Sequence, residues 1–224
     1  ETSVFHKKVV SLSIQRSCAC CLNFLYIMNF LVQLTQKNRK IPYSFLFYST
    51  DNIMQPYVLV LYYSKYGSTR EMAHLIANGV EAAGVAVKIR TVPNIAPVVK
   101  TAEPSIPAEG DIYCSLDDLA NCAGLALGSP TRFGNMASEM KFFWDQTTSL
   151  WLSGALHDKP ACVFTSSGSQ HGGQESTLLT MLPPLFHHGM MIMGLSNAHP
   201  ALSNTKTGGT PYGASHVSGP RHDQ

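Results

Sequence analysis

The sequence is poor in charge and has no long block of one sign. Only 13% of its 224 residues are Asp, Glu, Lys or Arg, whereas 45% are hydrophobic. Residues 1–53 carry six basic and two acidic residues, a net +4, and residues 54–224 carry ten basic and twelve acidic residues, a net −2. Because nucleic-acid binding depends on neutralising phosphates, this balance argues against a nucleic-acid partner. The length and hydrophobic content predict one sizeable globular domain.

Metal-ligand spacings are also missing. Three cysteines cluster within residues 18–21, and Cys114, Cys122 and Cys162 are isolated from one another in the sequence. None of the latter three belongs to a Cys-x-x-Cys pair or has a His partner at zinc spacing. We therefore expect no metal, and reduced thiols in a cytoplasmic protein.

No apolar run near the amino terminus is long enough to cross a membrane. Residues 22–34 are interrupted by Asn23, Asn29 and Gln33, and a spanning helix needs about 20 apolar residues. Basic residues precede this run, as in a signal peptide, but no small-residue cleavage site follows it. We expect no stable membrane insertion. We interpret residues 1–53 as a non-homologous stretch, disordered or translated in error upstream of a natural start at Met54, and residues 54–224 as the functional domain.

The standard nucleotide-binding signatures are absent, and a different phosphate-binding pattern is present. No Gly-Lys-Ser/Thr completes a Walker loop, and no Gly-x-Gly-x-x-Gly turn occurs. Instead, Ser64-Lys65-Tyr66-Gly67-Ser68-Thr69 follows an apolar run and opens a helical pattern. Hydroxyl donors, a glycine and a helix N-terminus favour a phosphate monoester. The same residues are also ordinary turn and cap chemistry, so both interpretations stay open at this point.

From Tyr57 onward, short apolar runs alternate with helical patterns, which is typical of an α/β doubly wound parallel sheet. Strands are predicted over 57–63, 85–92, 124–128, 161–166 and 190–195. Helices are predicted over 69–83, over 135–148, and from Gln174 to a close at His187-His188-Gly189, with an interruption at Pro183-Pro184. Residues 93–118 hold four prolines and predict a long surface connection. Residues 208–224 show no helical pattern, so the fold is expected to lack its last helix.

Two further loops follow predicted strands three and four. They are Pro130-Thr131-Arg132-Phe133-Gly134-Asn135-Met136 and Ser166-Ser167-Gly168-Ser169-Gln170-His171-Gly172. In the flavodoxin-like strand order 2-1-3-4-5, the loops after strands one, three and four meet at one edge of the sheet, where such sheets bind ligands. The sequence therefore predicts a single ligand site shared by the three loops.

Six stretches in order resemble the WrbA-type NAD(P)H:quinone oxidoreductases, a flavodoxin-like family that binds FMN. They are Val58–Thr69, Gly128–Met136, Leu150–Leu156, Phe164–Glu175, His187–Met190 and Gly208–Ala214. The resemblance covers about residues 56–219. It implies FMN as cofactor, NADH or NADPH as co-substrate, a quinone as substrate, and a homotetramer.

The resemblance also implies roles for single residues. The cofactor-binding set would be Ser64, Lys65, Tyr66, Gly67, Ser68, Thr69, Pro130, Thr131, Arg132, Phe133, Gly134, Asn135, Ser166, Ser167, Gly168, Ser169, Gln170, His171, Gly172 and His187. His187 would also supply a proton to the quinone, and Tyr66 and Trp151 would contact substrate, with Trp151 reaching in from a neighbouring subunit. Simpler alternatives are a turn tyrosine at 66, a surface charge at Arg132 and a core tryptophan at 151.

We thus expect FMN-dependent, two-electron quinone reduction by NAD(P)H, with ping-pong hydride transfer through flavin N5. One alternative is a flavodoxin-type one-electron carrier between protein partners, although the net charge of −2 over residues 54–224 is small for such a carrier. Another is an inactive, truncated gene product. The sequence does not separate NADH from NADPH, because no ribose-reading acid or 2′-phosphate arginine stands out.

Overall fold

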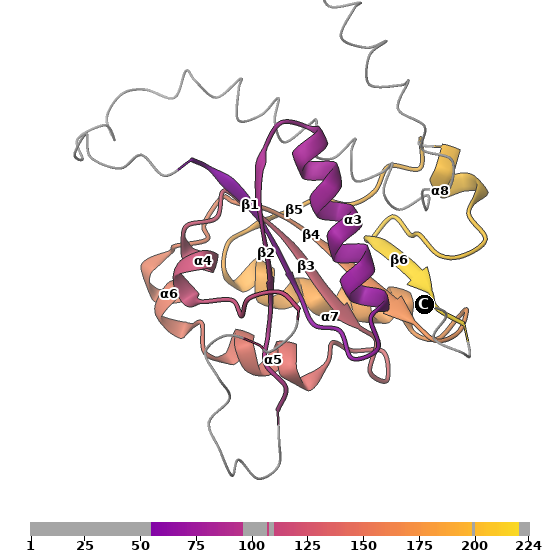
Figure 1. The fold of residues 1–224 in the computed structure, drawn as a ribbon, viewed down its shortest axis with the longest axis horizontal. Helices are drawn as coiled ribbons and strands as arrows, with labels where there is room; N and C mark the ends of the chain where they lie inside the picture. The colour runs from indigo at the N-terminus through magenta and orange to yellow at the C-terminus, as the bar shows by residue number, and fades with distance from the viewer. Residues whose placement is uncertain (1–54, 96–106, 108–109, 199, 220–224) are drawn as a thin grey trace, which may run out of the picture.

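A computed structural model describes residues 55–95, 107, 110–198 and 200–219. The prediction made for residues 1–53 lies outside the described residues. Within the described part, a parallel sheet is covered by helices on both faces (Figure 1).

The sheet has the predicted strand order. Its strands are β1 (Tyr57–Tyr62), β2 (Ala86–Thr91), β3 (Gly124–Pro130), β4 (Pro160–Ser167), β5 (Met191–Ile192) and β6 (Ala214–Val217). The order is β2-β1-β3-β4-β5, all pairs are parallel, and β6 also pairs with β4. The carboxyl ends of β1, β3 and β4 therefore lie at one edge.

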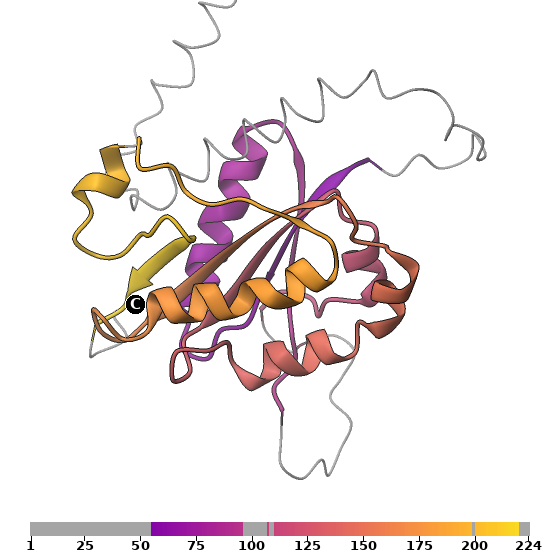
Figure 2. The same cartoon turned by 180° about the vertical axis from the view of Figure 1, so that it is seen from behind.

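Helices form a layer on each face of the sheet. They are α3 (Ser68–Ala82), α4 (Leu116–Ala120), α5 (Ser138–Asp145), α6 (Thr148–Ser153), α7 (Gln174–His187) and α8 (Pro200–Asn204). Helix α3 crosses the face turned to the viewer in Figure 1, and α5 and α7 cross the opposite face, seen from the front in Figure 2.

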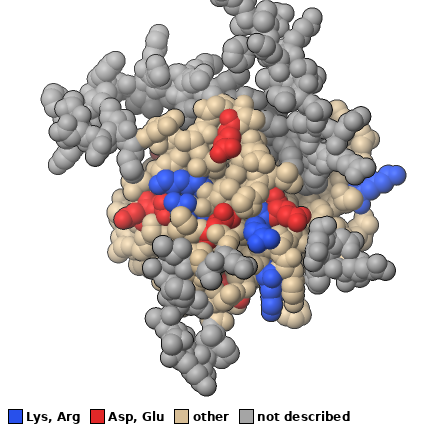
Figure 3. Space-filling view, viewed as in Figure 1, with Lys and Arg blue, Asp and Glu red and all other residues tan. Residues whose placement is uncertain are grey.

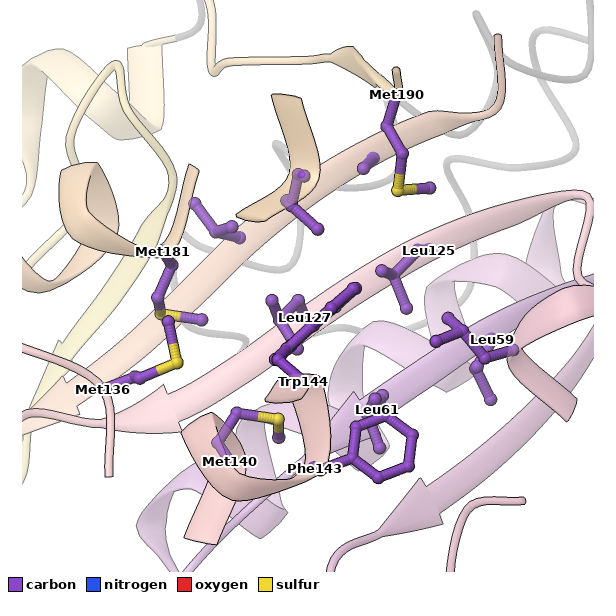
Figure 4. Close-up of a cluster of buried hydrophobic side chains, with 14 of the residues drawn as sticks. Leu59, Leu61, Leu125, Leu127, Met136, Met140, Phe143, Trp144, Met181 and Met190 are labelled. Carbon is purple, nitrogen blue, oxygen red and sulfur yellow. The ribbon is translucent and has the colours of Figure 1, made fainter. Parts of the chain in front are cut away.

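Alternating side chains of the strands supply two cores. In β1, Leu59 and Leu61 pack with Trp144 of α5 and Met181 of α7, and Figure 4 shows this cluster between the sheet and the two helices. Val60 and its neighbours on the other face pack against α3. A strand buried on both faces reads as a continuous apolar run, which is why β1 was evident in the sequence.

Two predicted helices differ from the structure. The helix expected over 135–148 is shorter and starts later, as α5, because Arg132 and Asn135 exchange backbone hydrogen bonds in a tight turn before α5 begins. A separate helix, α6, starts at Thr148. Helix α7 is not interrupted at Pro183-Pro184 but continues to His187. Its buried face, which includes Met181 and Leu185, packs on the sheet and offsets the roughly 3 kcal/mol that an interior proline costs.

The end of the sheet also departs from prediction. Strand β5 covers only Met191–Ile192, beside the start of β4, rather than residues 190–195. The glycine-rich segment after residue 208, predicted to hold no helix, contains a strand that was not predicted, β6, which pairs with the end of β4. A Cβ on Gly213 would lie 2.3 Å from the Val163 carbonyl oxygen, so glycine is required for this close approach. Residues 220–224 lie outside the described part.

Asp118 links α4 to the sheet edge. Its carboxylate accepts hydrogen bonds from Arg90 Nε at 3.0 Å and from the backbone N–H and hydroxyl of Ser115 at 3.2 and 2.9 Å. Burial disfavours the charged carboxylate, but these hydrogen bonds outweigh burial and lower the pKa of Asp118 to about 2.

We predict that Asp118→Asn lowers the free energy of unfolding by about 1–2 kcal/mol at pH 7. The folded-state pKa of Asp118 lies below its ordinary value of 3.8. The carboxylate therefore stabilises the fold above that value, and its contribution is lost as the pH falls towards 2. Urea unfolding at a series of pH values should show the difference between variant and wild type shrinking over that window. A difference independent of pH would contradict this account.

Candidate active site

Three loops converge at the carboxyl edge of the sheet, as the strand order requires. They enclose a cavity, called here the loop cavity. It is lined by Ser64, Lys65, Tyr66, Ser68, Thr69, Pro130, Thr131, Arg132, Ser166, Ser167, Gly168 and Ser218. Eleven of these twelve residues belong to the predicted set. On the face of the molecule that Figure 3 shows, acidic and basic side chains of the described residues are interspersed, and neither sign forms a broad patch.

The start of α3 contributes the strongest anion-binding feature of the loop cavity. Gly67 precedes the helix with φ +100°, and no side chain caps the first turn. The Ser64 hydroxyl accepts a hydrogen bond from the Gly67 N–H at 3.1 Å, which shapes the turn. The first N–H groups of the helix are thus directed into a cavity rimmed by the Ser68 and Thr69 hydroxyls. Such an arrangement favours a phosphate.

The loop after β3 is held rigidly by its neighbours. Its backbone has positive φ at Phe133 (53°) and Gly134 (77°), as the turn between Arg132 and Asn135 demands. The buried Thr177 hydroxyl of α7 donates to the Thr131 hydroxyl at 2.7 Å. The Phe133 side chain is fully exposed. A large apolar ring left in solvent beside a cavity is available to contact a ligand or another chain.

The third wall includes a residue that the sequence analysis missed. Ser218 follows β6, and its backbone N–H and hydroxyl donate to the Ser167 carbonyl at 2.8 and 3.0 Å. No sequence motif marked it, because its place depends on the pairing of β6 with β4. Nearby, Gln174 Nε2 donates to the Ser169 carbonyl at 3.2 Å, while the buried Gln174 Oε1 has no hydrogen-bond partner among the described residues.

A second cavity, called here the His187 groove, adjoins the loop cavity. It is lined by Lys65, Arg132, Phe133, Asn135, Met136, Ser138, Glu139, Lys141, Thr180, Pro183, Pro184 and His187. Lys65 and Arg132 line both cavities. Trp151 does not reach either cavity, but shares a separate hollow with His187 and is half exposed. The structure therefore does not support a core position for this tryptophan within the chain.

The two histidines that end α7 differ in their surroundings. His187 is exposed, whereas His188 is buried and its Nε2 lies 2.9 Å from the Thr147 hydroxyl. Burial lowers the pKa of His188, and the neighbouring His187 lowers it further. His188 is therefore neutral near pH 7 and fixes the helix end against α6. His187 is the accessible one of the pair.

Below the groove, Tyr63 and Glu139 form a buried polar contact. The Tyr63 hydroxyl lies 2.8 Å from Glu139 Oε1 and 3.0 Å from Asn94 Oδ1. Burial and the hydrogen bond to Glu139 raise the pKa of Tyr63 to about 12. The pKa of Glu139 is lowered although burial opposes this, because its own backbone N–H, Tyr63, Ser138 and Arg132 favour the carboxylate. At neutral pH the pair is a phenol donating to a carboxylate.

The remaining predicted residues lie around the two cavities without all facing one point. Gly67 lies on the far side of the first loop, and Phe133, Asn135 and His187 line the His187 groove. Four residues lie beyond the lining of the loop cavity within their own turn: Ser169, Gln170, His171 and Gly172. Tyr66 is exposed at the cavity mouth.

The described residues hold no cluster of three or more His, Cys, Asp or Glu side chains that could bind a metal ion. No helix in that part of the chain is both long and apolar enough to cross a membrane. The site therefore offers hydroxyls, backbone N–H groups, two cations and a histidine, at the edge where a doubly wound sheet binds its ligand. Fold and site together define a flavodoxin-like protein.

Comparisons with known proteins identify the family. Residues 56–200 match the family model described as NADPH-dependent FMN reductase. A relative from Rhizobium rhizogenes called NAD(P)H dehydrogenase (quinone) is 46% identical over 164 residues, which are 71% of this chain and 82% of that protein. One of the same name from Rhodopseudomonas palustris is 45% identical over 166 residues, 72% of this chain and 83% of that protein.

Among solved structures, a flavodoxin, WrbA-like protein from Agrobacterium tumefaciens is 25% identical. The match covers 64% of this chain and 87% of that one, with a TM-score of 0.47. On the matches to the family model and to these relatives, the chain belongs to the NADPH-dependent FMN reductase family, and it is a relative of proteins named NAD(P)H dehydrogenase (quinone).

We predict that inorganic phosphate binds at the start of α3 and shifts the backbone amide resonances of Ser68 and Thr69. Gly67→Ala should weaken this binding about fivefold, because φ +100° is costly for alanine and the first turn must move. Gly84→Ala is the matched control. Gly84 has φ +78° and open space around it beyond the other end of α3, so that variant should cost similar stability and leave phosphate binding intact. Equal loss in both variants would contradict the assignment.

Proposed function

We propose that this protein is an FMN-dependent oxidoreductase that reduces quinones with NADH or NADPH. The observation that carries the proposal is the convergence of three loops on one cavity that opens at an uncapped helix N-terminus. The names of the relatives supply the reaction class. The position of His187 beside that cavity supplies a proton donor.

The residues of the loop cavity fit FMN. The phosphate monoester matches the α3 N-terminus with its adjoining hydroxyls. Around Gly168, a Cβ would meet no atom within 4 Å, which leaves space at the third wall. The predicted cofactor-binding residues line the cavity from all three loops, so they would contact FMN along its whole length. When bound, FMN would accept hydride equivalents at N5 and pass two electrons to the quinone.

The residues of this chain would bind and orient the flavin and would protonate the quinone. The N–H groups of Thr131, Arg132 and Asn135 donate within the fold. We propose that those of Phe133 and Gly134, in the same loop held by Thr131 and Thr177, are directed to the ring system, where negative charge develops on reduction. His187 would deliver a proton to a quinone oxygen, and the exposed rings of Tyr66 and Phe133 would form an apolar slot for the substrate.

Assembly and location are also proposals. Trp151, Leu152 and Phe186 are exposed on α6 and α7. Exposed large apolar side chains are common at interfaces, and the expected homotetramer would bring Trp151 to a neighbouring site. We further propose a cytoplasmic location, in keeping with the free thiols of Cys114, Cys122 and Cys162.

We predict ping-pong kinetics, because both substrates would use the same cavity in turn. The full chain, loaded with FMN and purified by gel filtration, should retain flavin and reduce benzoquinone with NADH. Reciprocal plots at several fixed quinone concentrations should be parallel. Converging lines would contradict a shared cavity, and retained flavin without turnover would favour a one-electron carrier.

We predict that His187→Gln lowers kcat/KM for the quinone by about 100-fold, the lower end of the range for loss of a general acid. His157→Gln is the control, because its ring is exposed and lines neither cavity. Flavin content should be recorded for both variants, and rates expressed per bound flavin. If the two variants behave alike, His187 does not act on the quinone.

A further inference from the structure

Three cationic side chains from three separate elements line the His187 groove. Lys65 comes from the loop after β1, Arg132 from the loop after β3, and Lys141 from α5. The carboxylate lining the same groove is that of Glu139. In a chain with only 13% charged residues, this is a concentrated positive lining. It faces the cavity in which reduction is proposed to occur.

Two of these cations have no acidic partner. No carboxylate of the described residues lies within 4.0 Å of Lys65 or Arg132. Lys65 Nζ lies 5.8 Å from the centre of the Tyr66 ring, and Arg132 Nη1 donates to the Thr131 carbonyl at 2.8 Å. Lys141, by contrast, pairs with Asp145 at 2.5 Å on the exposed side of α5.

Glu139 does not neutralise the pair. Its oxygens are engaged by the hydroxyls of Tyr63 and Ser138, at 2.8 and 3.1 Å. Arg132 is close enough to favour its ionised form, yet forms no ion pair with it. The groove therefore keeps a net positive lining directed at solvent.

We propose that Lys65 and Arg132 bind the diphosphate group of the nicotinamide dinucleotide; this inference rests on the proposed function. A diphosphate carries two negative charges. A guanidinium can donate two parallel hydrogen bonds to such an anion, and an ammonium in the same cavity supplies a second positive charge. Because both residues also line the loop cavity, an anchored diphosphate leaves the nicotinamide end within reach of that cavity.

The FMN phosphate is the rival ligand for these cations. That monoester already has the uncapped N-terminus of α3 and the hydroxyls of Ser68 and Thr69. Lys65 and Arg132 instead border the second cavity, which extends past Met136 to Pro184. The geometry thus leaves the two cations for a second anion that enters from the groove.

The test compares two hydride donors on the FMN-loaded full chain. NADH carries the diphosphate, whereas N-benzyl-1,4-dihydronicotinamide has the same reacting ring and no charge. In Lys65→Gln, the ratio of kcat/KM for NADH to kcat/KM for the uncharged donor should fall about three- to fivefold relative to wild type, the effect of losing one exposed charge pair. Lys65→Glu should lower the ratio further, to about a tenth of wild type or less.

Binding without turnover provides a second measurement. ADP-ribose contains the diphosphate and cannot be oxidised at a nicotinamide, and its dissociation constant by calorimetry should rise by the same factor in Lys65→Gln. Lys206→Gln is the matched control, since Lys206 is exposed and lines neither cavity. It should change neither the ratio nor ADP-ribose binding. Added salt should lower kcat/KM for NADH more than kcat/KM for the uncharged donor, because salt screens interactions between exposed charges.

The outcomes separate the two proposals. If wild type oxidises neither donor, the proposed function is wrong. The diphosphate site is then tested by ADP-ribose binding alone, which should still be weaker in Lys65→Gln. If wild type uses both donors but Lys65→Gln leaves the ratio and ADP-ribose affinity unchanged, the subsite is wrong. Loss of FMN from Lys65→Gln, with the ratio per bound flavin unchanged, would assign Lys65 to the flavin phosphate and overturn the inference.

Discussion

The parallel pairing of β3 with both β1 and β4 is the constraint on which the rest of the structure depends. Parallel strands end at the same edge of a sheet. Each strand is therefore followed by a loop at that edge, and a helix then leads the chain back to the opposite edge. Three loops that lie between residues 64 and 172 in the sequence therefore meet at one edge as a consequence of the strand pairing itself. The helices on the two faces are the return paths, and their apolar stripes supply both cores.

The sequence predicted this framework well, because the relevant signals were local. The run at 57–63, buried on both faces, and the stripe of α3 each follow from periodicity alone. The predicted loop residues mostly line the two cavities for the same reason. What could not be predicted depends on distant partners. Ser218 enters the loop cavity only through β6, and the continuity of α7 through Pro183-Pro184 depends on packing against the sheet.

The charge distribution complements this geometry. Some acidic and basic groups elsewhere in the described residues form ion pairs, as Asp118 does with Arg90 and Lys141 does with Asp145. At the loop edge, Lys65 and Arg132 do not. A globular domain has little to gain in stability from leaving two cations unpaired at a cavity mouth, and such places are where anionic ligands bind.

The division of the last sheet position between β5 and β6 links ligand binding to completion of the fold. Strand β5 secures the start of β4, and the chain then leaves through α8 before β6 returns to the end of β4. The final wall of the site, at Ser218, exists only after that long excursion has closed. A ligand that touches this wall selects molecules in which β6 is docked, so its binding energy adds to the stability of the carboxyl-terminal segment. Occupancy of the site and resistance of that segment to proteolysis should therefore rise together.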